Sequence, residues 1–189
     1  MDKTELGEIL EYEKKLYLGD KSRQLRRVRH KRYTLWLYLR YFRLCQYWRG
    51  IRSGGETGRF GRLRAKYLSR MYERKKNKAG EKAGVEIGLQ SSVGKGLDMW
   101  HSGIVINGTL GEGCVLRGNN TIGGKADIKS VPVIGERVNI GAGAVIIGDV
   151  KIADDCVIGA NAVVTKSFAE PGSVIVGIPA AALPRKEKQ

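Results

Sequence analysis

An aliphatic residue recurs every six positions along the second half of the chain, and this period restricts the possible folds more than any other feature. The recurring residues fall into three registers, separated by a one-residue slip and by one interruption. They are Ile87, Val93, Met99 and Val105; Leu110, Leu116 and Ile122; and Ile134, Ile140, Ile146, Ile152, Ile158 and Val164. An amphipathic helix repeats at about 3.6 residues and an exposed strand at about 2, so neither explains the pattern.

A period of six suits a chain that winds around a triangular prism. Each short strand places one aliphatic side chain inside, a corner turns the chain onto the next face, and three hexads complete a coil. Small residues follow four positions later at Ser91, Cys114, Ala126, Ala144, Cys156 and Ala162. Corners require residues that adopt positive φ at little steric cost, and we expect this conformation at the glycines and at Asn139 and Asn161. The pattern predicts a mainly β fold, a left-handed parallel β-helix; a sandwich with glycine-rich turns is the alternative.

The chain divides by charge into a basic part and a neutral part. Residues 1–82 contain 24 Lys and Arg against 9 Asp and Glu, whereas the remainder contains 10 of each. The predicted domains are a basic helical region at 1–82, a β-helix at 83–180 with a projecting loop at about 124–132, and a tail at 181–189. Because the excess positive charge lies outside the repeats, it bears on partners and not on chemistry.

The cysteines and the N-terminus exclude several classes of protein. Cys45, Cys114 and Cys156 are too few and too far apart for a zinc knuckle or a disulfide framework, so we expect no metal site and a reducing compartment. The first residues lack the apolar segment of a secretory signal, and no apolar run approaches the ~20 residues of a membrane span. We predict a cytoplasmic protein, either soluble or peripheral at the inner face of the membrane.

Seven short motifs follow one another in the β-helical part. They are Val85-Glu86-Ile87, Gly94-Lys95-Gly96-Leu97, His101-Ser102-Gly103-Ile104-Val105-Ile106, Thr121-Ile122-Gly123-Gly124, Ile140-Gly141-Ala142-Gly143-Ala144, the run from Ile158 to Lys166, and Val176-Gly177-Ile178-Pro179-Ala180. With this ordered set, the stretch from Val85 to Pro179 resembles the hexapeptide-repeat acyltransferases, in the serine acetyltransferase-like branch that also contains O-acetyltransferases of surface polysaccharides. The resemblance implies acetyl-CoA as co-substrate, no metal, and a homotrimer, with a dimer of trimers as an open alternative.

The resemblance identifies His101 as the general base and Glu86, fifteen residues earlier, as the carboxylate that orients it. A hydroxyl group is a poor nucleophile until its proton is accepted, and a carboxylate fixes the tautomer of the imidazole. The alternative role for His101 is a corner residue hydrogen-bonded to the backbone. The second histidine, His30, lies in a basic run. Two histidines cannot supply the three zinc ligands of the carbonic anhydrases that share this fold.

In this family acetyl-CoA lies between neighbouring subunits, along backbone amides and near cationic side chains. The residues that the resemblance assigns to this site are Gly123, Gly124, Ala142, Ala160, Thr165, Lys166 and, from the tail, Arg185. Plain corner residues and solvated side chains are the alternatives. Backbone N–H groups near the loop are expected to stabilise the oxyanion of the tetrahedral intermediate.

Two positions depart from serine acetyltransferases. Trp100 replaces the aspartate that precedes the catalytic histidine, and Val131 replaces a second histidine before the proline that closes the loop. Losing a carboxylate that would pair with an amino group argues against an amino-acid acceptor, and indole rings stack on sugars; packing at a subunit interface is the alternative for Trp100. We predict transfer to a sugar hydroxyl of a surface or capsular polysaccharide or its precursor, with Trp100, Asp98 and Asn120 in contact with this carbohydrate acceptor. A serine O-acetyltransferase of cysteine biosynthesis and a non-enzymatic scaffold are the alternatives.

Arginines alternate with aromatic residues between Tyr33 and Arg49, and a glycine-rich break at 52–58 separates this segment from a second basic helix expected around 62–78. Such a region can contact an anionic membrane surface, with Trp36, Tyr41 and Trp48 as anchors. The same aromatic residues can equally pack on one another or on the trimer. A polyanionic glycan is another potential partner, and we expect no nucleic-acid partner because no binding motif accompanies the charge.

Overall fold

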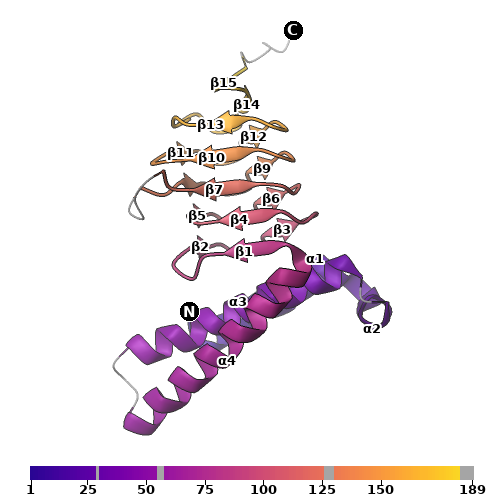
Figure 1. Ribbon diagram of the computed structural model, residues 1–189, viewed down its shortest axis with the longest axis vertical. Coiled ribbons are helices and arrows are strands. Elements are labelled where there is room, and N and C mark those ends of the chain that lie inside the picture. The colour runs from indigo at the N-terminus through magenta and orange to yellow at the C-terminus, as the bar shows by residue number, and fades with distance from the viewer. Residues whose placement is uncertain (29, 55–57, 126–129, 184–189) are drawn as a thin grey trace. The chain divides into compact units, whose positions relative to one another are not determined.

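The computed structural model describes residues 1–28, 30–54, 58–125 and 130–183. The chain separates into two compact units, Met1–Val85 and Glu86–Gln189. The first unit is helical, and the second consists of short strands stacked in successive coils (Figure 1). Within the described residues, none of the helices combines the length and the apolar character needed to cross a membrane.

The helical unit contains two long helices after a shorter N-terminal segment. Its elements are α1 (Lys3–Leu18), the 3-10 turn η1 (Gly19–Lys21), α2 (Ser22–Arg27), α3 (Lys31–Ser53) and α4 (Arg59–Ala83). A capping box begins α1, in which Asp2 and Glu5 each accept a hydrogen bond from the other's backbone N–H. Gly84, with φ 64°, ends α4 in the left-handed conformation. The segments predicted at 33–49 and 62–78 lie within α3 and α4.

Helices α3 and α4 pack along the small residues of α4. The buried residues of α4 include Ala65, Ser69, Ala79 and Gly80, opposite the buried Leu35, Leu39 and Phe42 of α3. At Gly80 an added Cβ would lie 2.9 Å from the Tyr38 ring, so the close approach requires glycine. A buried ion pair, Arg43 Nη2 to Glu13 Oε1 at 2.7 Å, joins α3 to α1. Because the pair is buried, removing either partner would leave an uncompensated charge.

The aromatic residues expected to anchor the chain in a membrane pack within the helical unit. Trp36 is only 8% exposed, so its assignment as an anchor is wrong. The ring of Tyr41 lies 6.3 Å from that of Tyr72, and the Arg64 guanidinium lies 5.6 Å from the ring of Trp48. Of the alternatives for this segment, packing against other residues of the helical unit is the one that the contacts support.

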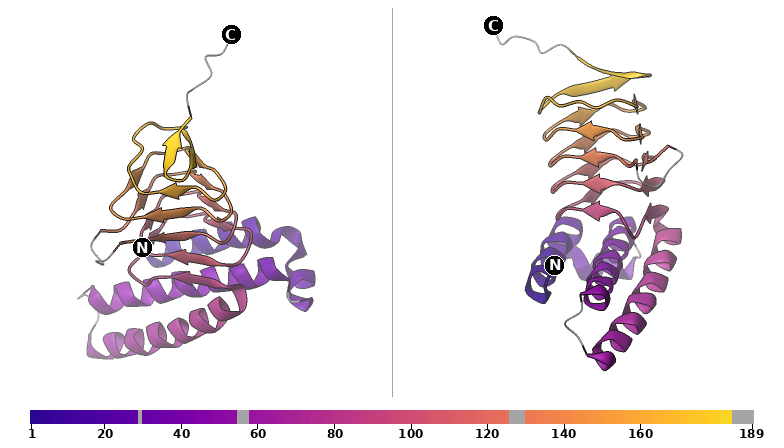
Figure 2. Two further views of the ribbon diagram at one scale, coloured as in Figure 1. Left: turned by 45° about the horizontal axis from the view of Figure 1, so that its top comes forward. Right: turned by 90° about the vertical axis from the view of Figure 1, so that its left-hand side faces the viewer.

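The second unit is a left-handed parallel β-helix, as the hexad period predicts. Its strands are β1 (Val85–Ile87), β2 (Ser92–Val93), β3 (Asp98–Met99), β4 (Ile104–Ile106), β5 (Thr109–Leu110), β6 (Val115–Leu116), β7 (Thr121–Gly123), β8 (Val133–Ile134), β9 (Asn139–Ile140), β10 (Val145–Ile147), β11 (Lys151–Ile152), β12 (Val157–Ile158), β13 (Val163–Val164), β14 (Val174–Gly177) and β15 (Ala180–Ala182). They form sheet A (β1-β4-β7-β10-β13), sheet B (β11-β8-β5-β2) and sheet C (β15-β14-β12-β9-β6-β3). Successive strands join different sheets, so three strands complete one coil (Figure 2). The last pair, β14 with β15, is antiparallel.

Aliphatic side chains of successive coils stack inside the prism. The hexad positions are buried with one exception. Val105 was predicted to point inward, but it is half-buried, and Ile104 and Ile106 on either side of it are buried instead. Ile106 pairs with Ile122, so the one-residue slip falls within β4. The small residues Ser91, Cys114, Ala144, Cys156 and Ala162 are buried as expected, and Ala126 lies outside the described residues.

The corners use positive φ at one of the two asparagines predicted and at other polar residues, Asn119, Arg137 and Asp155. Asn161 has φ 57°, as expected, whereas Asn139 lies in β9 and Arg137 has the positive φ at that corner. The reason is position, because the left-handed residue comes two places before the strand. Arg137 donates to both carboxylate oxygens of Asp155, at 2.7 and 2.9 Å, and these hydrogen bonds lower the pKa of Asp155.

An insertion lengthens one coil where the loop was predicted. Leu116 pairs with Ile140, while the next coil runs only from Ile140 to Ile158. The extra residues fall between β7 and β8, where the structure describes Gly124, Lys125 and residues 130–132 but not 126–129. The backbone of β7 therefore ends beside the start of this insertion.

Burial should make all three native thiols unreactive. Burial raises the pKa of Cys114 to about 11, with its Sγ 3.2 Å from the carbonyl oxygen of Gly135, and raises the pKa of Cys45. Cys156 is also buried. We expect Ellman's reagent at pH 8 to leave the native protein unmodified and to titrate the three thiols after denaturation. A Leu63→Cys variant, with a thiol at a position that is 56% exposed, is the positive control; rapid labelling of the unmodified chain would contradict this burial.

Candidate active site

The corner that joins β3 to β4 carries His101, and its position is fixed by the next coil. Met99 pairs with Leu116, and the backbone N–H of Trp100 donates to the Leu116 carbonyl at 3.0 Å. This register aligns His101 with Gly118, where an added Cβ would overlap the Cβ of His101. Gly118 has φ 114°, which other residues rarely adopt. The side chain of His101 is exposed, whereas its backbone packs against Gly118, a position that only glycine suits.

Small residues continue the same corner through the following coils. The strand registers align His101 with Gly118, Ala142 and Ala160, a set that we call the His101 column. Backbone hydrogen bonds connect its levels, from the N–H of Gly143 to Gly118 and from the N–H of Asn161 to Ala142, each at 2.9 Å. Ala142 and Ala160 are exposed, and beyond His101 the column carries no side chain larger than a methyl group. Two residues predicted to bind acetyl-CoA therefore share a corner with the predicted base.

The other predicted cofactor residues lie where the strands of sheet A end, on the side opposite the His101 column. Ile147 pairs with Gly123, and the pairing of Ile146 with Val164 aligns Ile147 with Thr165 as well. Thr165 and Lys166 are exposed, and the Lys166 ammonium lies 5.6 Å from the ring of Phe168. Gly124 is half-buried beside them in sequence, whereas Arg185 lies outside the described residues. The predicted cofactor residues within the described ranges thus border sheet A on its two sides.

Glu86 lies on the outer surface of sheet A. It is the exposed central residue of β1, and the N–H of the following Gly88 donates to Ile106 of β4 at 2.9 Å. His101 precedes β4 by three residues, so the predicted dyad comes from strand β1 and from the corner that leads into the neighbouring strand β4. Within the part of the chain that the structure describes, no hydrogen bond or ion pair joins Glu86 to His101. Their pairing stays a prediction.

Trp100 is held by polar side chains from successive coils. Its indole Nε1 donates to Asp98 Oδ2 at 2.9 Å, and the Arg117 guanidinium lies 4.0 Å from the ring centroid. Arg117 Nε in turn donates to Asn139 Oδ1 at 3.3 Å. We call Asp98, Trp100, Arg117 and Asn139 the Trp100 cluster. Trp100 remains 44% exposed, so one face of the indole is covered by Arg117 while part of the ring stays open to a ligand.

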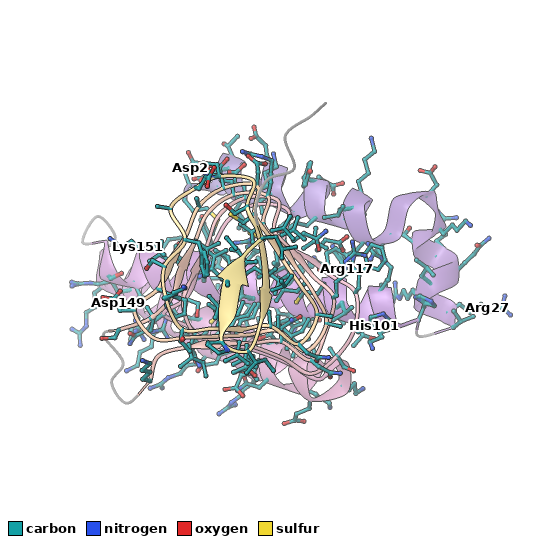
Figure 3. The ribbon with its side chains drawn as sticks, turned by 90° about the horizontal axis from the view of Figure 1, so that it is seen from above. Asp2, Arg27, His101, Arg117, Asp149 and Lys151 are labelled. Atoms are coloured by element: carbon teal, nitrogen blue, oxygen red, sulfur yellow. The ribbon has the colours of Figure 1, made fainter. Side chains whose placement is uncertain are left out.

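Seen from above, His101 and Arg117 lie at one corner of the prism, and Asp149 and Lys151 lie at another (Figure 3). Arg117 and Gly118 belong to none of the seven sequence motifs. Both follow from the strand register, because they lie one coil beyond Trp100 and His101. Aligning the hexads across the one-residue slip would have found them.

Asn120, which was assigned to the acceptor, has no access to one. It is fully buried, its Oδ1 accepts from the N–H of Gly118 at 2.9 Å, and its Nδ2 donates to Gly141 at 2.7 Å. The amide therefore connects two corners of the His101 column from inside the prism. Its position does not support a role in acceptor binding. Among the described residues, no group of three or more His, Cys, Asp or Glu side chains could hold a metal ion.

The β-helical unit matches a known repeat family. Residues 132–166 match the model described as bacterial transferase hexapeptide (six repeats). A serine acetyltransferase of Mycobacterium tuberculosis is 41% identical over 96 residues, which are 51% of this chain and 35% of that protein. A serine acetyltransferase of Helicobacter pylori is 38% identical over 99 residues, 50% of this chain and 57% of that protein. The aligned region thus spans about half or less of these curated relatives.

Solved structures support the fold of the chain. Serine acetyltransferase of Neisseria gonorrhoeae has a TM-score of 0.70 at 24% identity, covering 98% of this chain and 67% of that one. The Brucella abortus serine acetyltransferase has a TM-score of 0.72 at 19% identity, covering 98% and 71%. The sequence matches make the β-helical unit similar to the hexapeptide transferases and, over about half of this chain, to serine acetyltransferases. They give no support for the narrower assignment to enzymes of capsular polysaccharides.

Replacing Asn120 with alanine should destabilise the β-helix. The change leaves the N–H of Gly118 without its acceptor inside the prism and removes a donor from the carbonyl of Gly141. Unsatisfied buried polar groups cost about 1 to 3 kcal/mol, so we expect a loss of stability of about 2 kcal/mol in chemical denaturation. Asn119→Gly is the matched control, because Asn119 is exposed with φ 53° and glycine adopts that conformation without strain. Equal stability of the two variants would contradict this role.

Proposed function

We propose that the chain is an acetyl-CoA-dependent O-acetyltransferase that acts as a homotrimer, with His101 as the general base. The His101 column carries the proposal: an exposed histidine, fixed by Gly118, is followed along its corner by Ala142 and Ala160. The similarity of the β-helical unit to hexapeptide transferases and to serine acetyltransferases supports the same chemistry. The neutral imidazole would accept the proton of an acceptor hydroxyl while that oxygen attacks the carbonyl carbon of the thioester. The C–S bond then breaks, and the imidazolium can return the proton to the departing thiolate.

The residues around sheet A fit the thioester substrate. The small side chains of the exposed Ala142 and Ala160 leave room for a pantetheine arm to approach this corner. The exposed Thr165 and Lys166 at the other border of the sheet supply a hydroxyl donor and a cation, which suit phosphate groups. Gly123 and Gly124 belong to the same border. In the family the co-substrate lies between subunits, so we propose that a second copy of the chain completes the site.

Glu86 is proposed to orient His101. A carboxylate that accepts a hydrogen bond from one imidazole nitrogen leaves the other free to accept a proton, and it stabilises the resulting cation. Both side chains are exposed and come from neighbouring elements of sheet A and its entry corner. The proposal requires a side-chain movement or the assembled trimer to bring them into contact.

Two acceptors are candidates. L-serine is supported by the curated relatives, which are named serine acetyltransferases. A sugar hydroxyl is supported by the Trp100 cluster, because the partly exposed indole replaces the carboxylate that a serine ammonium group would require. Arg117 does not discriminate between them, since a guanidinium would bind the carboxylate of serine and that of an acidic sugar equally well. The comparisons favour serine and the local chemistry favours a sugar.

His101→Ala should abolish most of the turnover and leave the fold intact. General base catalysis contributes roughly 100- to 10,000-fold, so kcat should fall by that factor in an assay of CoA release. Because the side chain is exposed, the melting temperature should stay close to that of the unmodified chain. His30→Ala is the control, since it removes the other histidine without touching the site. Retained activity with a large loss of stability would instead show that His101 is a structural corner residue.

The acceptor can be identified by offering L-serine and candidate glycans separately with acetyl-CoA. If the acceptor is a sugar, Trp100→Ala should raise its KM about two- to twelvefold, because an aromatic contact contributes about 0.5 to 1.5 kcal/mol, and Trp100→Phe should retain most of the affinity. CoA release with serine, equal in both variants, would exclude the sugar. Absence of acetyl-CoA binding by calorimetry would exclude both and favour a non-enzymatic scaffold.

A further inference from the structure

Helix α4 carries an exposed apolar stripe. Phe60 is 89% exposed, Leu63 56% and Tyr67 69%. Their spacing places them on one side of the helix. The buried residues of α4 lie on the opposite side: Ala65, Ser69, Lys76, Ala79, Gly80 and Ala83. Since burying large apolar side chains stabilises a folded chain, three of them left in water on one helix face indicate a surface that is covered by a partner.

Positive charge surrounds the stripe. A surface pocket combines the apolar Leu63, Tyr67 and Met71 with the cationic Lys66, Arg70 and Arg74. Helix α4 contains ten Arg and Lys against two Glu. Arg70, Arg74 and Lys78 are exposed, and no ion pair neutralises any of these three within the described ranges. The face is therefore both apolar and cationic, and its charge is available to a ligand.

Of three potential occupants, namely a second copy docked by the same face, a polyanion and an anionic lipid surface, the lipid surface matches both properties. A second copy docked through the same face would bring two cationic faces together, which is unfavourable. A polyanionic glycan or nucleic acid would satisfy the arginines but leave Phe60 and Leu63 in water. The headgroup region of an anionic bilayer supplies negative charge at the level of the arginines and hydrocarbon beneath it. Tyr67 suits this boundary, because its ring is apolar and its hydroxyl is polar.

We propose that the outer face of α4, formed by Phe60, Leu63 and Tyr67 with Lys66, Arg70 and Arg74, binds the surface of an anionic phospholipid membrane. The helix would lie parallel to the membrane, with the three apolar side chains at the boundary between headgroups and acyl chains. This replaces the anchors expected from sequence, Trp36, Tyr41 and Trp48, by a set on the next helix. The inference does not depend on the proposed acyl transfer.

The test is co-sedimentation of the full chain with vesicles. We expect binding to vesicles of phosphatidylcholine and phosphatidylglycerol at low salt, release at high salt, and no binding to phosphatidylcholine alone. Each basic residue near an anionic surface contributes about fivefold in affinity, so Arg70→Glu with Arg74→Glu should weaken binding at least about twentyfold. The triple change Phe60→Ser, Leu63→Ser and Tyr67→Ser should abolish binding at unchanged helicity, since these side chains are exposed.

A matched control separates this face from net charge. Arg23→Glu with Arg26→Glu changes the charge equally on α2, where both residues are exposed, and should leave most of the binding. Equal loss in the two double variants would overturn the proposal. So would binding of heparin or DNA, with no binding to anionic vesicles.

Insertion has its own readout. Because the native cysteines are buried, Leu63→Cys can be labelled selectively with an environment-sensitive dye. A blue shift of its emission on adding anionic vesicles is expected, and the same dye at Arg23→Cys should not shift. An unshifted dye at position 63 in the presence of bound vesicles would show that the face does not enter the lipid.

Discussion

The hydrogen-bond register between successive coils is the constraint on which the rest of the β-helical unit depends. Backbone N–H groups donate from one coil to the next along the prism, as from Trp100 to Leu116 and from Arg117 to Ile140. The same register stacks aliphatic side chains inside, so that Met99, Leu116, Ile140 and Ile158 form one continuous column. Burial of these side chains and satisfaction of the backbone are therefore one geometric condition. The same register determines which side chains are neighbours on the outer surface of the prism.

The sequence predicts this fold well because the hexad period belongs to the core. The prediction is wrong for two residues, Val105 and Asn139. Val105 occupies a hexad position, yet Ile106 points inward because β4 absorbs the one-residue slip. Asparagine is a residue type that suits a corner, but Asn139 lies in a strand. The left-handed conformation occurs two residues before the strand, at Arg137. The hexad pattern assumes a constant spacing, whereas the coils of the structure differ in length.

The candidate site shows the same division. His101 and the small residues of its column could be named from motifs, since glycine and alanine at a corner reflect a local steric requirement. Asn120 could not be assigned correctly, because a buried amide that connects Gly118 to Gly141 has the same sequence signature as an exposed one that binds a ligand. Arg117 was missed because its partners, Trp100 and Asn139, come from the coils on either side. Contacts between coils become visible only when the register is known.

The helical unit obeys a different rule, in which composition alone is misleading. Arginines and aromatic residues are interleaved in both α3 and α4. In the segment richer in them, between Tyr33 and Arg49, several of these side chains pack inside the unit: Trp36 and Tyr38 are buried, and Arg43 pairs with Glu13. Helix α4 packs largely through alanine, serine and glycine, and the large side chains of Phe60, Leu63 and Tyr67 remain on the outer face. Close packing on small residues thus determines which aromatic residues are left exposed. The surface available to a partner is set by the residues that the helix interface does not need, and in this chain those residues are apolar and cationic together.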